Sequence, residues 1–300
     1  MTRALTLGLA LALGTVLAQS GGDTAPVTLA VTAPAGTLVT YDVTQTLVGT
    51  VEEVRVEPRP NVRLTAEALE DYKRRFAGAG GNPKPVNLSY VEYLRVLPPT
   101  ADGSVALQVT SDQTIEGLTQ KLRYRQVISP DGTTRVEALP GTSPELRRVV
   151  ESLDTSGVFG TTPAVYGRPL TVDAPVTQEG RLDFARVLGS SLPGVSLSGD
   201  VTYRNVLTYR GARPDGTRLV ETASTFGPAT VTVEAGGLRQ TVEVGAGTAS
   251  SSTTLRPDGL ASRLESRSTA RIGTRLDLPE LPVVVTVVVR QEQTLRQTAR

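Results

Sequence analysis

The chain of 300 residues contains no cysteine and no histidine. Without cysteine it forms no disulfide and offers no thiolate to a metal, and without histidine it lacks the commonest zinc ligand and general base. Histidine-based triads, thiol nucleophiles and nearly all zinc or transition-metal sites are therefore excluded. Extracytoplasmic proteins of higher organisms usually carry disulfides at this length, so the absence of cysteine also favours a bacterial source.

Aromatic residues are scarce as well, with no tryptophan, 4 phenylalanines and 8 tyrosines. We therefore expect an aliphatic core and no sugar-stacking cleft. Transmembrane barrels need aromatic girdles and an apolar band on nearly every strand, and this composition argues against one. The net charge is +1 and the arginines are scattered rather than clustered, so we predict no nucleic-acid partner.

Catalytic motifs are missing too. The sequence has no nucleophile elbow, no Walker loop and no Ser-x-x-Lys motif. Residues 154–157 (Asp-Thr-Ser-Gly) resemble the aspartic protease motif with one residue too many, and they fit the glycine-capped end of a helix better. A glycosidase-type carboxylate pair stays open in principle; the candidate acids are Glu52, Glu53, Asp173, Glu221 and Glu234. We predict that the protein is not an enzyme and has no catalytic residue, metal site or cofactor.

What the sequence does contain is a repeated pattern of alternating residues broken by Asp-Gly. In the clearest copy, residues 201–226, the side chains of Val201, Tyr203 and Leu207 fall on one face of an extended chain. The run is interrupted at residues 214–216 (Pro-Asp-Gly). Proline sets one turn angle, and Asp and Gly tolerate the left-handed one, so the pattern predicts a β-hairpin. Similar junctions recur at residues 102–103, 130–132 and 257–259.

Further alternating runs and a few changes of period define the expected fold. Residues 37–47 alternate cleanly, and residues 283–289 are the strongest β-forming run in the chain. Helical periodicity predicts helices over residues 65–76, 143–153 and 181–188. We therefore predict a mainly β protein: a large curved antiparallel sheet, either a half-barrel or a sandwich, with two or three short helices.

The first 18 residues have the pattern of a signal peptide. Arg3 supplies positive charge, residues 4–16 are apolar, and residues 16–18 (Val-Leu-Ala) end in the small-residue cleavage pattern. The alternative, a membrane anchor, needs about 20 apolar residues, more than this stretch provides. We expect cleavage and export to the periplasm or the extracellular space, with no integral membrane segment in the mature protein.

The remaining chain divides by composition. A flexible lead (19–26) precedes an N-terminal β half with two helices (27–156), a junction rich in Gly, Pro and Thr (157–194) and a C-terminal antiparallel β half (195–300). Residues 90–136 and 203–264 can be superposed at their turns. The two halves are therefore either related by duplication or share only the turn spacing of any meander.

The order of elements, together with the signal peptide, resembles the half-barrel carriers of lipids and lipoproteins in bacterial envelopes. The resemblance includes no diagnostic motif and assigns no binding residue, and such carriers are usually shorter. It implies an apolar cavity between a curved sheet and helices that serve as lids. The predicted cavity-lining residues are Tyr41, Val43, Leu69, Tyr72 and Phe76. The alternative is that both helices simply cover a core.

Two functional hypotheses follow. The first is a non-enzymatic exported envelope protein that binds or carries an apolar ligand such as a lipid or an acyl chain. The second is a structural or protein-interaction component of the cell envelope that pairs with an envelope protein through exposed strand edges. An edge position for residues 283–289 would favour the second hypothesis, and a cavity lined by the five residues above would favour the first.

Overall fold

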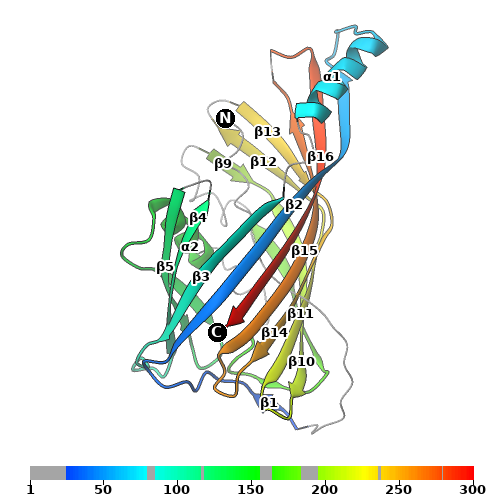
Figure 1. Cartoon of the computed structure of the whole chain (residues 1–300). Coiled ribbons are helices and arrows are strands. Elements are labelled where there is room, and N and C mark those ends of the chain that lie inside the picture. Colours follow the sequence, from blue (N-terminus) through cyan, green and yellow to red (C-terminus); the bar gives the residue numbers. More distant parts are fainter. Residues whose placement is uncertain are drawn as a thin grey trace.

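The computed structural model describes residues 25–79, 85–115, 118–155, 164–183, 195–235, 238–278 and 280–300. One antiparallel sheet of 14 strands dominates it, and a second sheet has only two strands (Figure 1). This confirms the predicted mainly β fold with a large antiparallel sheet. The predicted signal peptide and most of the predicted lead lie outside the described residues.

The chain contributes its strands in three groups. The first group is β1 (Val27–Thr28), β2 (Leu38–Pro58), β3 (Val86–Val96), β4 (Val105–Ile115), β5 (Leu118–Ile128) and β6 (Thr134–Ala138). The second group is β7 (Pro169–Leu170), β8 (Pro175–Asp183) and β9 (Val195–Ser198). The third group is β10 (Asp200–Ala212), β11 (Arg218–Phe226), β12 (Ala229–Ala235), β13 (Leu238–Val244), β14 (Gly247–Leu255), β15 (Ala261–Leu276) and β16 (Val283–Ala299). The helices are α1 (Ala66–Ala79) and α2 (Pro144–Thr155).

The large sheet is continuous across the predicted halves. Its strand order is β6-β5-β4-β3-β2-β16-β15-β14-β11-β10-β8, and β12, β13 and β9 extend it beside the upper part of β15. Strand β2 pairs with β16 from Tyr41 to Pro58, so the first and last long strands of the chain lie side by side (Figure 1). Within the described part of the chain the sheet ends at β6 and β8 and does not close on itself.

Residues 283–289 belong to β16 and lie between β2 and β15, so they do not form the sheet edge that would have favoured the interaction hypothesis. The physical reason is burial on both faces. Val283 and Val285 are completely buried on one face, and Val284 and Val288 are buried on the other. An apolar run without alternation is typical of a central strand.

All four Asp-Gly junctions form the same tight hairpin turn. In each turn the glycine has a φ between +79° and +86°, and the aspartate carboxylate accepts a hydrogen bond from the second backbone N–H after it. A left-handed φ suits glycine because it has no Cβ. The hairpins predicted at these junctions are confirmed, and they join β3 to β4, β5 to β6, β10 to β11 and β14 to β15.

A segment formed by residues 27–33 and 164–172, here called the plug, packs against both flanks of the sheet. It contains the two-stranded β1–β7 sheet, which lies at the lower end of Figure 1. Leu29 and Leu170 are buried against Leu207 and its neighbours on one flank. On the other flank the plug joins a cluster that includes Ala33, Val39, Tyr41, Val43, Val96, Leu107, Ile128 and Leu260. These contacts define the inner face of the sheet.

The two described helices match the predictions closely. The Thr65 hydroxyl accepts a hydrogen bond from the Ala68 backbone N–H (3.2 Å) and caps α1. Helix α2 begins at Pro144, one residue after the predicted start. The third predicted helix is wrong where it can be compared: residues 181–183 continue β8 and pair with β10, because Gln178, Gly180 and Leu182 alternate inward. Its remaining residues lie outside the described part.

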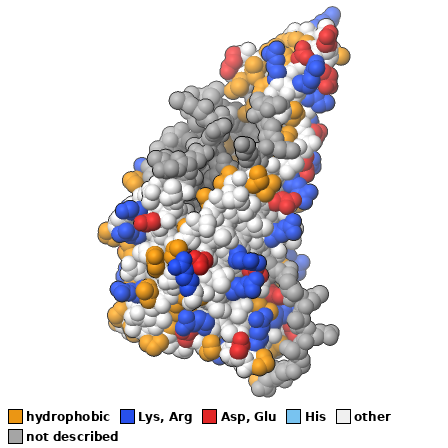
Figure 2. All heavy atoms as spheres, in the orientation of Figure 1, with side chains coloured by type: hydrophobic (Ala, Val, Ile, Leu, Met, Phe, Trp, Pro, Cys, Tyr) orange, Lys and Arg blue, Asp and Glu red, His pale blue; other side chains and the backbone are white. Residues whose placement is uncertain are grey.

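The face of the sheet seen in Figure 2 carries charged, polar and hydrophobic side chains in a mixed arrangement. Acidic and basic side chains lie scattered over it, close to one another. Arg300 pairs with Asp42 (2.6 Å), and Arg296 pairs with Glu265 (2.8 Å) on neighbouring strands. These pairs are exposed and contribute little to stability. They are consistent with an outer face that is exposed to solvent. The inner face is therefore the more suitable location for a ligand site.

Candidate functional site

The five predicted cavity residues fall into two separate clusters. Tyr41 and Val43 lie in the cluster next to the plug. Leu69, Tyr72 and Phe76 of α1 pack against Val54, Val283 and Val285 near the other end of β2. At about 3.3 Å per residue, Val43 and Val54 are roughly 36 Å apart along the strand. The five residues therefore line no common cavity: α1 follows the end of β2 and folds back onto that end.

A carboxyl group that sequence reasoning missed lies beside Tyr41 and Val43. Glu92 on β3 is the register partner of Tyr41 on β2, and Tyr90 is the partner of Val43. Glu92 is half-buried, and its Oε1 accepts a hydrogen bond from Gln297 Nε2 (2.9 Å) on β16. The signal was present in the alternation. Glu92 shares a strand face with Tyr90, Leu94 and Val96, so an acid stands in an apolar row.

The electrostatics of this carboxyl are unusual. Burial raises the pKa of Glu92 to about 7, and the hydrogen bond from Gln297 opposes the shift. Among the described residues no lysine or arginine pairs with it. Burial, followed by the charge of Glu92, raises the pKa of Tyr90 to about 12 and also raises the pKa values of Tyr41 and Tyr124. The three phenols are therefore neutral at physiological pH.

A serine hydroxyl completes the arrangement. Ser111 on β4 is the register partner of Glu92, so both side chains point to the same face. It is only 2% exposed, and among the described residues its Oγ has no hydrogen-bond partner. A buried hydroxyl without a hydrogen-bond partner is uncommon, and a polar group of a bound ligand would satisfy it. We call the set Tyr41, Tyr90, Glu92, Ser111, Tyr124 and Gln297 the Glu92 site.

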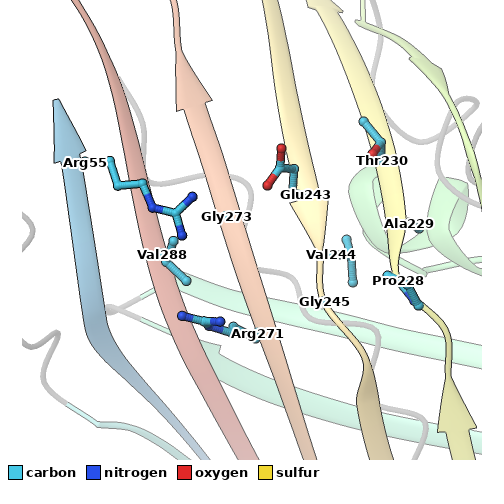
Figure 3. A pocket seen from close by; sticks show the side chains of 10 residues that line it. All are labelled: Arg55, Pro228, Ala229, Thr230, Glu243, Val244, Gly245, Arg271, Gly273 and Val288. Atoms are coloured by element: carbon cyan, nitrogen blue, oxygen red, sulfur yellow. The ribbon is translucent and has the colours of Figure 1, made fainter. Parts of the chain in front are cut away.

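A cavity of about 340 Å³ lies elsewhere, and its lining residues come mainly from β12, β13 and β15 (Figure 3). Figure 3 shows Arg55 and Arg271 over one part of it and Glu243 on a neighbouring strand. Both arginines already have acidic partners, because Arg271 pairs with Glu52 (2.8 Å) and Arg55 with Glu53 (2.6 Å). The cavity therefore offers no free positive charge to an anionic ligand.

The acidic candidates from the sequence are mostly engaged in ion pairs. Glu52 and Glu53 pair with arginines at the cavity just described. Asp173 (2.8 Å) and the buried Glu221 (2.6 Å) both pair with Arg210. Glu234 lies in β12 and also has a partner. Within the described ranges no group of three or more acidic side chains is placed to hold a metal ion.

Comparisons with protein-family models and with curated proteins found no match for this chain. In the described part of the chain, neither helix has the length and apolar character needed to cross a membrane.

Proposed function

We propose that this protein is a non-enzymatic, exported envelope protein that binds or carries an apolar ligand, such as a lipid or an acyl chain. The observation that carries the proposal is the Glu92 site itself. One half-buried carboxyl and one hydroxyl without a partner among the described residues lie beside apolar residues such as Val43 and Leu94. Ligand sites are typically mostly apolar with a few polar groups that fix orientation.

The proposal places the polar end of the ligand at Glu92 and its apolar part along the inner face. Glu92, Tyr90 and Tyr124 are each partly exposed, whereas Tyr41 and Ser111 are buried, so a ligand would approach from the side of Glu92, Tyr90 and Tyr124. The neighbouring groups do not favour catalysis. The phenols are neutral, and the Ser111 hydroxyl makes no hydrogen bond to the carboxyl among the described residues, so no nucleophile is activated as a Ser–base pair would require. Export is part of the proposal because Arg3 and the apolar residues 4–16 have the pattern of a signal peptide.

Binding through strand edges is not put forward as a second function. The strongest β-forming run lies inside the sheet. The edge strand β8 carries Glu179, Arg181 and Asp183, and charged side chains of this kind protect edges against pairing. The charges of β8 make it a poor template for an added strand.

Mass spectrometry of the purified mature protein tests the proposal, in the native state and after solvent extraction. We expect a bound lipid or acyl compound at near-stoichiometric amount. Tyr90→Ala should lose it, whereas Tyr93→Ala, on the exposed face of the same strand, should keep it. A ligand-free native mass, together with no uptake from a bacterial lipid extract, would overturn the proposal.

A further inference from the structure

We propose that the Glu92 site binds the primary ammonium group of an amphiphile whose carbon chain lies along the apolar residues beside it, such as Val43 and Leu94. The inference deepens the proposed function and rests on it. The proposed function leaves the polar group of the ligand open, and the Glu92 site indicates that this group is an ammonium. Three features of the site carry the inference: the uncompensated carboxyl, the tyrosine rings and the unpartnered serine hydroxyl.

The first feature is the charge. Among the described residues Glu92 is bonded to the neutral Gln297 and to no cationic side chain. A half-buried carboxylate is poorly solvated and gains most from a cation that comes close to it. An anionic ligand end would be repelled by the carboxylate, and a neutral hydroxyl would leave the charge uncompensated.

The second feature is the aromatic surroundings. Tyr41, Tyr90 and Tyr124 all lie near enough to Glu92 for its charge to raise their pKa values. They come from three different strands, β2, β3 and β5. Neutral aromatic rings attract organic cations through the negative faces of their π systems. A carboxylate among tyrosines is therefore chemically suited to an alkylammonium group.

The third feature separates primary from quaternary ammonium. Ser111 Oγ lies beside Glu92 in register and has no partner among the described residues. The nearby Tyr41 OH does not serve as its donor, because it donates to the Ala261 carbonyl (2.9 Å). A primary ammonium has three N–H donors, of which one can bond Ser111 Oγ and another the Glu92 carboxylate. A trimethylammonium group has no N–H and would leave the serine unsatisfied.

Binding of a cation at Glu92 should depend on pH. The cation needs the ionised carboxyl, whose pKa in the free protein is about 7. The facing groups on the neighbouring strands are Tyr41, Tyr90 and Tyr124, which do not titrate near neutral pH. Beyond Tyr41 lie Tyr166 and the ion pair of Arg256 with Asp258, whose charges also act on Tyr41. Below pH 7 the affinity for alkylammonium should therefore fall by about tenfold for each pH unit, whereas affinity for a neutral ligand of equal chain length should not change.

Isothermal titration calorimetry with four decyl probes tests the inference on the mature protein: decylammonium, decyltrimethylammonium, decanol and decanoate. We expect decylammonium to bind at least about tenfold more tightly than decanol near pH 8. Glu92→Gln should abolish that difference, and Ser111→Ala should weaken decylammonium but not decyltrimethylammonium. Glu265→Gln, on the outer face beside Arg296, is the matched control and should bind like wild type.

The outcomes separate the two proposals. If decanol or decanoate binds as tightly as decylammonium, the ammonium inference is overturned while apolar-ligand binding stands. If decyltrimethylammonium binds most tightly and Ser111→Ala has no effect, the role of the serine is wrong. If none of the probes binds, both proposals fall. Circular dichroism of each variant shows whether lost binding comes from lost folding.

Discussion

The two ends of β2 contain hydrophobic clusters of different kinds. Near Val54 and Val56 the partners are valines of β16 and the apolar side of α1. Near Tyr41 and Val43 the wall also contains Glu92, its tyrosines and a buried serine without a partner. The first cluster is apolar throughout, as expected where a helix covers a core. The second contains a half-buried carboxyl that, in the described part of the chain, is bonded only to a neutral amide, and it is there that we propose the ligand binds.

The largest expected effect concerns the plug, which only one of these ends has. A Cβ on Gly259 would lie 2.1 Å from the Ala30 carbonyl oxygen in the plug, whereas a Cβ on Gly103 would meet only a proline side-chain carbon at 3.9 Å. Both glycines have a left-handed φ, so both variants bear that backbone strain. We expect Gly259→Ala to lower the free energy of unfolding by about 4 kcal/mol and Gly103→Ala by about 1 kcal/mol.

Urea unfolding of the two glycine variants measures this difference. Equal losses would show that the close approach of the plug to the turn does not matter. The contrast between the plugged end and the helix-covered end of β2 would then have no consequence for stability.

The next effect is pH dependence at the plugged end. The pKa of Glu92 is about 7 in the folded protein, against an ordinary value of 4.5. The folded state thus binds the proton more tightly, so the contribution is fully present below pH 4.5 and is lost as the pH rises to about 7. We expect the free energy of unfolding to fall over this window by at most about 3 kcal/mol.

Chemical denaturation of wild type and of Glu92→Gln across this pH window provides the measurement. The variant cannot titrate at this position and should lack most of the dependence. A wild-type profile that is flat, or that rises with pH while the variant behaves identically, would show that Glu92 is not desolvated in the folded protein.

The smallest effect is expected at the helix-covered end. Phe76→Ala removes a partly buried ring that packs on Val283 and its neighbours, and it should lower the free energy of unfolding by about 2 kcal/mol. Because this cluster is separate from the Glu92 site, decylammonium affinity should stay at the wild-type value. Thermal melting and calorimetry of the same sample check both statements. A loss of binding without a loss of stability would make α1 a lid, as the resemblance to the half-barrel carriers implies, and not a helix that only covers a core.

Local pattern predicted much of this fold. The Asp-Gly turns and the alternating strands were found because each depends on neighbouring residues, and α1 and α2 were found from helical spacing. Strand order depends on pairing between distant segments, so the central position of residues 283–289 was missed, although their apolar character on both faces indicates it. The same applies to the site. Glu92 stands in an apolar row, but its partners Ser111 and Gln297 come from other strands.

The most direct test of the central claim is an NMR titration of the mature protein with decylammonium. Chemical-shift changes locate the binding site on one end of β2 or the other. Our account predicts the largest changes at Tyr90, Glu92 and Ser111, and little change at Leu69 and Phe76. Changes concentrated on α1, or spread evenly over the exposed face of the sheet, would contradict it.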